Sequence, residues 1–247
     1  MHTLNRVCKK WDEIICYDCR EMKILPTQHE IALEEMEPFR GVIFNNSQFY
    51  LPVRNHKIDY IPTAIWSLGS LTSITIGSDG GGFVLKKGIP ESMFYLRNLR
   101  RLHMHYCGID RIPDSIGRLT NLETLSLNGN KLTSLPESIG NLTRLDGLLV
   151  WGNGLTSLPE SIGDLKSLRA LYIDRNKLKK LPDSLGKLYN LQDLMMVKCG
   201  MDYIPEIVLN MTTLWDLSID QKQSESIPPE LYERIHPIIH VFKHSKP

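Results

Sequence analysis

The chain has 247 residues, of which 42% are hydrophobic, so it is long enough to bury a sizeable core as one large domain or two small ones. Its 29 Lys and Arg residues nearly balance 28 Asp and Glu residues, which argues against a nucleic-acid-binding protein, because those usually carry a strong basic excess. No apolar run approaches the roughly 18 residues of a membrane span. The first residues also lack the basic start and apolar stretch of a signal peptide. We therefore expect a cytoplasmic protein, with a secreted or exported protein as the alternative.

Residues 1–38 are expected to form an N-terminal cap. Apolar residues recur at helical spacing over residues 4–17, which predicts an amphipathic helix that covers one end of the domain that follows. Cys16 and Cys19 form a CxxC pattern with Cys8 upstream, but a zinc ribbon needs a second such pair and the chain has none. We interpret these cysteines as small apolar residues of the cap, with a disulfide as the alternative if the chain is exported.

From residue 39 to residue 98, apolar residues recur at the spacing LxxLxL that becomes regular further along the chain. Two units fit this spacing, one with nine extra residues and one with five. The residues that fill the apolar places are Phe39, Val42 and Phe44 in the first unit, and Leu71, Ile74 and Ile76 in the second.

From residue 99 to residue 236, the chain repeats itself every 23 residues. The string LTSLPESIG at residues 132–140 recurs letter for letter at residues 155–163. Six consecutive frames keep this register without an insertion, which is typical of a solenoid built from stacked units. The column that opens each unit consists of Leu99, Leu122, Leu145, Leu168, Leu191 and Leu214.

The residue type at each place of one unit has a structural role. Its LxxLxL portion predicts a short strand, with the residues at places one, four and six facing inward. No single unit can bury these residues alone, so neighbouring units must stack. Asn at place nine is expected to turn inward and satisfy backbone groups of the bend, with Cys107 and Cys199 standing in for it in two units. A proline then stops strand pairing and starts the return segment, and a glycine permits the bend back.

The unit LxxLxLxxNxLxxLPxxIGxLxx resembles the leucine-rich repeat family, in particular its 23-residue LPxxIG type, which is found in bacterial proteins and in plant intracellular Ras-group repeat proteins. The resemblance implies an α/β solenoid: a horseshoe arc with a concave parallel β-sheet, a convex side of short helical turns and a helical N-terminal cap. Eight repeats are expected, at residues 39–70, 71–98, 99–121, 122–144, 145–167, 168–190, 191–213 and 214–236.

The pattern decays towards the C-terminus. Lys222 replaces the Asn of place nine and Tyr232 replaces the glycine, as is typical of a terminal repeat. Residues 237–247 are expected to form a C-terminal cap or tail. We expect the protein to be a monomer.

The resemblance implies that the outward places of the strands, three, five, seven and eight, form the binding surface. Most residues there are polar or small, but three consecutive repeats carry apolar side chains. A contiguous apolar patch on a soluble surface usually marks an interaction site, and Trp and Tyr are enriched among interface hot spots. The patch consists of Leu149, Trp151, Tyr172, Met195 and Val197.

Charged and aromatic residues flank this patch, as expected for the rim of an interface. On the N-terminal side they are Arg101, His103, His105 and Tyr106, and within or beyond the patch they are Asp174, Arg175, Asp193, Asp216 and Asp220. The alternative interpretation is that some of these side chains pack against their neighbours, a terminal segment or a second copy of the chain.

The sequence gives little support for metal binding or catalysis. His103 and His105 share a strand face, but with Cys107 in the inward column they offer two ligands where structural zinc needs four. We therefore expect no metal and no cofactor, and keep a metal-responsive scaffold as a further alternative. No combination of residues assembles a nucleophile, a base and an orienting group, so we do not expect an enzyme. The sequence favours a protein–protein interaction scaffold, with the substrate-recognition part of a bacterial effector of the ubiquitin-ligase type as the alternative.

Overall fold

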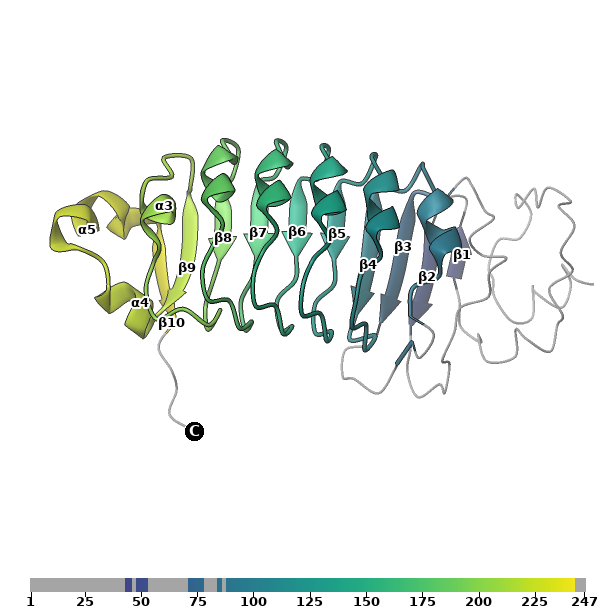
Figure 1. Ribbon diagram of the computed structural model, residues 1–247, viewed down its shortest axis with the longest axis horizontal. Helices are drawn as coiled ribbons and strands as arrows, with labels where there is room; N and C mark the ends of the chain where they lie inside the picture. The colour runs from purple at the N-terminus through teal and green to yellow at the C-terminus, as the bar shows by residue number, and fades with distance from the viewer. Residues whose placement is uncertain (1–42, 46–47, 53–70, 78–83, 86–87, 243–247) are drawn as a thin grey trace, which may run out of the picture.

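The computed structural model describes residues 43–45, 48–52, 71–77, 84–85 and 88–242. Its strands are β1 (Ile43–Asn45), β2 (Gln48–Pro52), β3 (Ser73–Gly77), β4 (Arg101–His105), β5 (Thr124–Ser126), β6 (Gly147–Leu149), β7 (Ala170–Tyr172), β8 (Asp193–Met195), β9 (Asp216–Asp220) and β10 (Ile239–Phe242). They form one sheet in which strand order equals chain order, and all neighbours are parallel except the antiparallel pair β1–β2 (Figure 1). This open, curved arc is the expected α/β solenoid.

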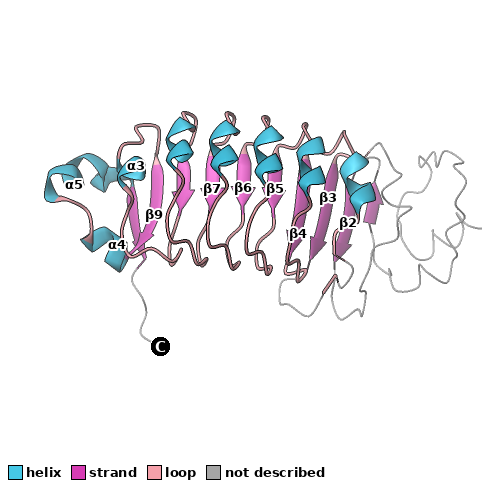
Figure 2. Cartoon of the chain, viewed as in Figure 1, coloured by secondary structure: helices cyan, strands magenta, loops and turns pink. Residues whose placement is uncertain are grey.

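Short helices lie along one face of this sheet (Figure 2). On this face are the 3-10 helices η4 (Glu91–Tyr95), η5 (Asp114–Arg118), η6 (Glu137–Asn141), η7 (Glu160–Asp164) and η8 (Asp183–Lys187), and the α-helix α3 (Glu206–Leu209). At the C-terminal end of the sheet follow the α-helices α4 (Gln221–Glu225) and α5 (Pro229–Ile235) and the 3-10 helix η9 (His236–Ile238). A proline directly precedes each of η4 to η8 and α3; Pro159, for example, has φ −69° and ψ 152°. Because proline fixes φ and lacks an N–H, it ends the extended path and begins the convex turn, as predicted.

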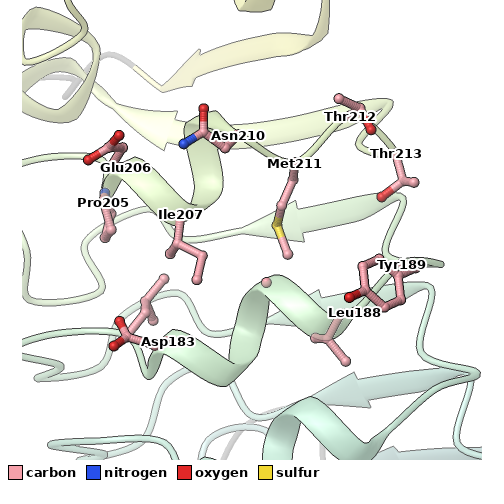
Figure 3. Close-up of a pocket in the computed structure, with 12 residues that line it drawn as sticks. Asp183, Leu188, Tyr189, Pro205, Glu206, Ile207, Asn210, Met211, Thr212 and Thr213 are labelled. Atoms are coloured by element: carbon pink, nitrogen blue, oxygen red, sulfur yellow. The ribbon is translucent and has the colours of Figure 1, made fainter.

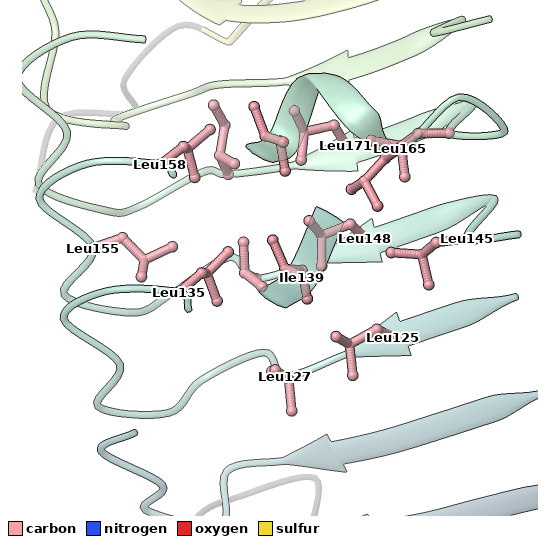
Figure 4. Close-up of a cluster of buried hydrophobic side chains, with 14 of the residues drawn as sticks. Leu125, Leu127, Leu135, Ile139, Leu145, Leu148, Leu155, Leu158, Leu165 and Leu171 are labelled. Atoms are coloured by element: carbon pink, nitrogen blue, oxygen red, sulfur yellow. The ribbon is translucent and has the colours of Figure 1, made fainter. Parts of the chain in front are cut away.

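The core lies between the sheet and the helices, and the predicted inward places fill it (Figure 4). Leu145, Leu148 and Val150, at places one, four and six of one repeat, are all 0% exposed. Ile139 and Ile162 of the neighbouring 3-10 helices are equally buried and close the core from the convex side. Each repeat thus buries its apolar residues against the next, which confirms the stacking that the 23-residue period predicts.

The inward direction of the asparagine column is confirmed. Asn130 is 7% exposed, and its side-chain Oδ1 accepts hydrogen bonds from the backbone N–H groups of Cys107 (3.0 Å) and Ile109 (3.1 Å). Its Nδ2 donates to the carbonyl oxygens of Met104 (2.7 Å) and Leu127 (2.8 Å). One amide therefore satisfies backbone groups that the turn would otherwise bury without partners.

The same column continues through the neighbouring repeats. Asn153 donates to the carbonyls of Leu127 and Val150, and Asn176 donates to that of Val150, so neighbouring repeats share a carbonyl acceptor. Cys107 stands in this column as predicted, and its thiol donates to the carbonyl of His105 at 3.3 Å.

The first repeat differs from its prediction. A strand was expected over Phe39, Val42 and Phe44, but β1 starts at Ile43 and pairs antiparallel with β2. It is β2 that continues the parallel sheet, with Gln48 in register with Ser73 of β3. Because this unit has nine extra residues, its apolar residues can be aligned with the repeat in more than one way. In the structure, β2 and not β1 occupies the strand position beside β3.

The C-terminal end shows two features that the repeat pattern does not contain. Gln223 follows Lys222 in α4 and takes over the role of the missing Asn, since its Nε2 donates to the carbonyls of Met196 and Met201, each at 3.1 Å. After α5, the chain returns to the sheet as β10, whose Ile239 is in register with Leu217 of β9. Part of the expected tail at residues 237–247 is therefore a further strand.

The expected N-terminal cap at residues 1–38, with its helix at 4–17 and with Cys8, Cys16 and Cys19, lies outside the described residues. Across the ranges that the structure describes, none of the helices has the length and apolar character needed to cross a lipid bilayer.

Candidate binding face

In the described part of the chain, η4 to η8 and α3 all lie on one face of the sheet, and we call the opposite face the concave face (Figures 1 and 2). Strand residues at places three, five and seven belong to it, and places four and six point into the core. The parallel register aligns equal places on neighbouring strands, as with Thr124 beside Gly147 and Ser126 beside Leu149. Neighbouring strands are about 4.8 Å apart, so side chains at equal places lie side by side across the face.

The five predicted apolar residues, Leu149, Trp151, Tyr172, Met195 and Val197, lie on adjacent strands of the concave face, and we call them the apolar block. Leu149 of β6 is in register with Tyr172 of β7, which is in register with Met195 of β8. Trp151 and Val197 lie two residues further along their own repeats. All five side chains are partly exposed. The structure thus brings the predicted patch together.

Tyr106 joins the apolar block from the N-terminal side. Its backbone has φ 53°, and its ring lies 5.9 Å from the ring of Trp151 between centroids, at an edge-on angle of 75°. Gly129 makes room for this ring, because a Cβ atom there would lie 2.2 Å from Tyr106 Cε1. An edge-to-face pair of this kind stabilises both rings and extends the aromatic surface.

Arg101, His103 and His105 on β4 form what we call the basic end of the concave face. Arg101 is exposed, and the rings of His103 and His105 stack with centroids 5.7 Å apart. His105 Nε2 lies 2.7 Å from the hydroxyl oxygen of Ser126 on β5, within hydrogen-bonding distance. The predicted common face of the two histidines is confirmed.

The environment of His103 opposes its protonation. Burial, the neighbouring His105 and the Arg101 guanidinium each lower the pKa of His103, in that order of size. Its Nε2 atom is buried and has no hydrogen-bond partner among the described residues. In the described part of the chain, no cluster of three or more His, Cys, Asp or Glu side chains is arranged to hold a metal ion.

Asp193 of β8 and Asp216 of β9 form the acidic end, and they are register partners. The hydroxyl of Tyr172 donates a hydrogen bond of 2.5 Å to Asp193 Oδ2. Burial, followed by this bond and by the charge of Asp193, raises the pKa of Tyr172 to about 12. Tyr172 therefore stays neutral and links the apolar block to the acidic end.

The acidic end is crowded with negative charge. Burial raises the pKa of Asp193, and the neighbouring Asp216 raises it further, against the opposing hydrogen bond from Tyr172. Asp216 Oδ2 lies 3.4 Å from His240 Nε2 on β10, an ion pair when the imidazole is protonated. Asp216 Oδ1 also accepts a hydrogen bond of 3.3 Å from the Ser218 hydroxyl.

The remaining predicted charges have different surroundings. Asp174 is half-buried, and its Oδ1 accepts from the backbone N–H of Val197 at 3.1 Å; burial raises its pKa, partly offset by that bond and by Arg175. Arg175 is exposed, with φ 49°. Asp220 does not belong to the binding surface: it is 6% exposed and caps α4 by accepting from the N–H of Gln223.

A groove on the helical side was not predicted. It lies between η8 and α3, has a volume of about 590 Å³ and is lined by Leu188, Tyr189, Ile207 and Met211, among others (Figure 3). It forms where the repeat pattern changes, because Ile207 stands where the preceding repeats have Ser184, Ser161 and Ser138. That substitution, together with Tyr189 at a place where the other repeats between residues 71 and 213 have threonine, lysine or arginine, is the signal in the sequence.

Comparisons with known proteins agree with this architecture. The family described as leucine-rich repeat region matches residues 147–236, and the family described as leucine rich repeats (2 copies) matches residues 97–142. Among solved structures, a leucine-rich-repeat protein of Leptospira interrogans superposes with a TM-score of 0.64 at 23% identity over 87% of this chain. The leucine-rich repeat domain of the type III effector XopL superposes with a TM-score of 0.51 at 26% identity over 56% of this chain.

A third similar structure is the plant peptide hormone receptor RGFR1 in complex with RGF2, with a TM-score of 0.58 at 27% identity over 75% of this chain. The chain spans 54% of the Leptospira structure, 50% of the XopL domain and 30% of the receptor. A search of curated protein sequences returned no match.

Proposed function

Because this chain belongs to the leucine-rich-repeat family, we propose that it is a protein–protein interaction module whose concave face holds a protein partner. The observation that carries this proposal is the apolar block at the centre of that face. Its Trp and Tyr are the residue types most enriched in interface hot spots, and a contiguous partly exposed apolar surface is uncommon unless it is used for binding. The residues we assign to the binding face are the apolar block, Tyr106, Asp174, Arg175, the basic end and the acidic end.

The construction of the face supports this role. On its inward side, each strand packs against a continuous leucine core, and the asparagine column hydrogen-bonds the turns that follow the strands. The backbone that carries the outward side chains is therefore held in a fixed position. Binding to a preformed surface avoids most of the entropic cost of ordering the protein on association. On a rigid sheet, contact between the partner and an aromatic side chain therefore contributes to affinity with little loss of conformational entropy.

The test compares two double variants that remove the same residue types. Trp151→Ala/Tyr172→Ala removes the aromatic anchors of the concave face. Tyr189→Ala/Trp215→Ala removes two aromatic residues that are 72% and 73% exposed and lie outside the strands. Each purified protein is used to capture partners from lysates of the source organism and of candidate hosts, and the affinity for a captured protein is then measured directly.

We expect the concave-face variant to bind the partner at least about 30-fold more weakly, which corresponds to roughly 2 kcal/mol, while the control binds like wild type. Circular dichroism confirms that both variants are folded. Equal affinity of wild type and the concave-face variant contradicts the proposal and moves the interaction away from this face.

A second candidate function is the substrate-recognition part of a bacterial effector that carries a catalytic domain elsewhere, such as a ubiquitin ligase. The specific observation in its favour is the similarity to the leucine-rich repeat domain of XopL. The coding sequence of the complete gene tests this: a catalytic domain joined to the repeats supports it, and its absence contradicts it.

A further inference from the structure

We propose that the concave face receives an extended segment of the partner with three features in a set order: an acidic residue beside Arg101, an apolar side chain on the apolar block, and a Lys or Arg over Asp193 and Asp216. This inference rests on the proposed function and specifies the chemistry of the partner.

The basic residue of the segment follows from the acidic end. Asp193 and Asp216 are register partners on β8 and β9, so two carboxylates stand next to each other on strands about 4.8 Å apart. Like charges directly opposite in a sheet destabilise it. His240 is the neighbour that can offset them, and only when it is protonated. Within the described residues, no Lys or Arg forms an ion pair with either carboxylate.

The acidic end also keeps hydrogen-bonding capacity. Asp193 uses Oδ2 to accept from Tyr172, while its Oδ1 accepts no hydrogen bond from any described residue. An ammonium or guanidinium group placed there gains a charge-assisted hydrogen bond and relieves the repulsion between the two carboxylates. The apolar stem of a Lys or Arg would lie on Tyr172 and Met195, which border this position on the apolar block.

The acidic residue of the segment follows from the basic end. Arg101 is exposed and forms no ion pair with any described residue. His103 and His105 share its strand, and an imidazole carries either no charge or a positive charge. A carboxylate of the partner fits Arg101, because guanidinium binds carboxylate with two parallel hydrogen bonds.

The spacing of the strands sets the spacing of the segment. From β4 to β8 there are four strand steps, or about 19 Å, and an extended chain covers about 3.3 Å per residue. In a segment that crosses the strands, the basic residue therefore follows the acidic residue by about six positions. The apolar block starts at β6, about 10 Å from the basic end, so the apolar residue falls near the middle of the segment.

The test uses four peptides, acetylated and amidated so that their ends carry no charge. Ac-ESSFLSK-NH2 contains all three features at the inferred spacing. Ac-ESSFLSQ-NH2, Ac-QSSFLSK-NH2 and Ac-QSSFLSQ-NH2 lack the basic residue, the acidic residue or both. Binding is measured by titration into isotope-labelled protein at low salt, with NMR shifts reporting both the affinity and the residues affected.

A matched pair of protein variants completes the design. Asp193→Asn/Asp216→Asn neutralises the acidic end with side chains of the same shape. Asp164→Asn/Asp183→Asn removes the same charge from two exposed residues of η7 and η8 on the helical side.

For wild type, we expect the peptide with Glu and Lys to bind about fivefold more tightly than the one with Glu and Gln. That ratio should fall to about one in Asp193→Asn/Asp216→Asn and stay unchanged in Asp164→Asn/Asp183→Asn. The peptide without charges should bind both variants equally.

Two negative outcomes are distinguishable. Equal affinity of wild type for the Lys and Gln peptides, with shifts still centred on the apolar block, overturns the inferred chemistry and leaves the proposed function standing. Shifts outside the concave face, or none with any phenylalanine-containing peptide, contradict the inference and weaken the proposed function together.

Discussion

The imidazole of His103 is held in surroundings that favour its neutral form. Burial removes the solvent that would stabilise the protonated ring, and the neighbouring His105 and Arg101 disfavour a further positive charge, so the pKa of His103 is lower in the folded protein than in the unfolded chain. Protons therefore bind preferentially to the unfolded chain. The contribution of His103 to stability is complete above about pH 6.5 and is lost as the pH falls below that value.

We predict that the free energy of unfolding of wild type falls between pH 7.5 and pH 5, and that His103→Gln removes part of this fall. Arg101→Gln should remove a smaller part, because Arg101 is the last-ranked cause of the shift. Urea titrations at both pH values measure the effect, and an NMR titration of the His103 ring should show a pKa below about 6.5. An unchanged pH dependence in His103→Gln contradicts this account.

At the residue scale, the sequence predicts which side chains share the concave face but not how they interact. Place five of the repeat brings Leu149, Tyr172 and Met195 together, because the strand period is two and the register repeats. The bond from Tyr172 to Asp193 depends on side-chain rotamers and burial, which no column of letters contains. Asp220 was misplaced because a helix starts directly after β9 and uses it as a cap.

At the element scale, the stacking of the convex helices depends on one glycine column. A Cβ atom at Gly163 of η7 would lie 2.4 Å from the backbone oxygen of Ser184, which belongs to the next helix. At Gly186 of η8, the nearest atom is Ile207 Cδ1 at 3.0 Å, the end of a flexible side chain. The same substitution therefore meets a rigid obstacle at one position and a movable one at the next.

We predict that Gly163→Ala lowers the free energy of unfolding by about 1–3 kcal/mol, because backbone must shift to admit the methyl group. Gly186→Ala should change it by less than about 1 kcal/mol, since Ile207 can move and the loss of glycine flexibility in the unfolded chain offsets the strain. Denaturant unfolding of the two variants beside wild type tests this. Equal destabilisation of both would mean that the groove between η8 and α3 is as tightly packed as the preceding interfaces.

The elements were predictable where the 23-residue period is unbroken and less so where it is not. From Leu99 onward, each leucine column fixes the inward face of its strand, so sheet, core and return helices follow from the pattern. The insertion near residue 39 leaves the alignment open, and the structure uses β2. Comparing equal places of the repeats does not find Gln223, because it stands one position after the Asn place. Its longer side chain still reaches the equivalent carbonyl, that of Met196.

At the scale of the whole molecule, near-neutral overall charge conceals a polarised binding face. The formal net charge is +1, yet the basic end lies on β4 and the acidic end on β8 and β9 of the same sheet. The separation of β4 and β8, about 19 Å, exceeds the Debye length of about 8 Å at physiological ionic strength. The electrostatic interaction between the two charged regions is therefore largely screened, and each region acts on a bound segment independently.

This separation predicts additive effects on binding of the peptide Ac-ESSFLSK-NH2 at physiological salt. The loss of binding free energy in the triple variant Arg101→Gln/Asp193→Asn/Asp216→Asn should equal the sum of the losses in Arg101→Gln and in Asp193→Asn/Asp216→Asn, within about 0.5 kcal/mol. Within the acidic end, by contrast, the single changes Asp193→Asn and Asp216→Asn should not add, because the two carboxylates are neighbours that share one bound cation. Dissociation constants for the five variants and wild type measure both cycles. Strong coupling between the two ends would mean that the sheet or the bound segment shifts as a unit when either end is changed.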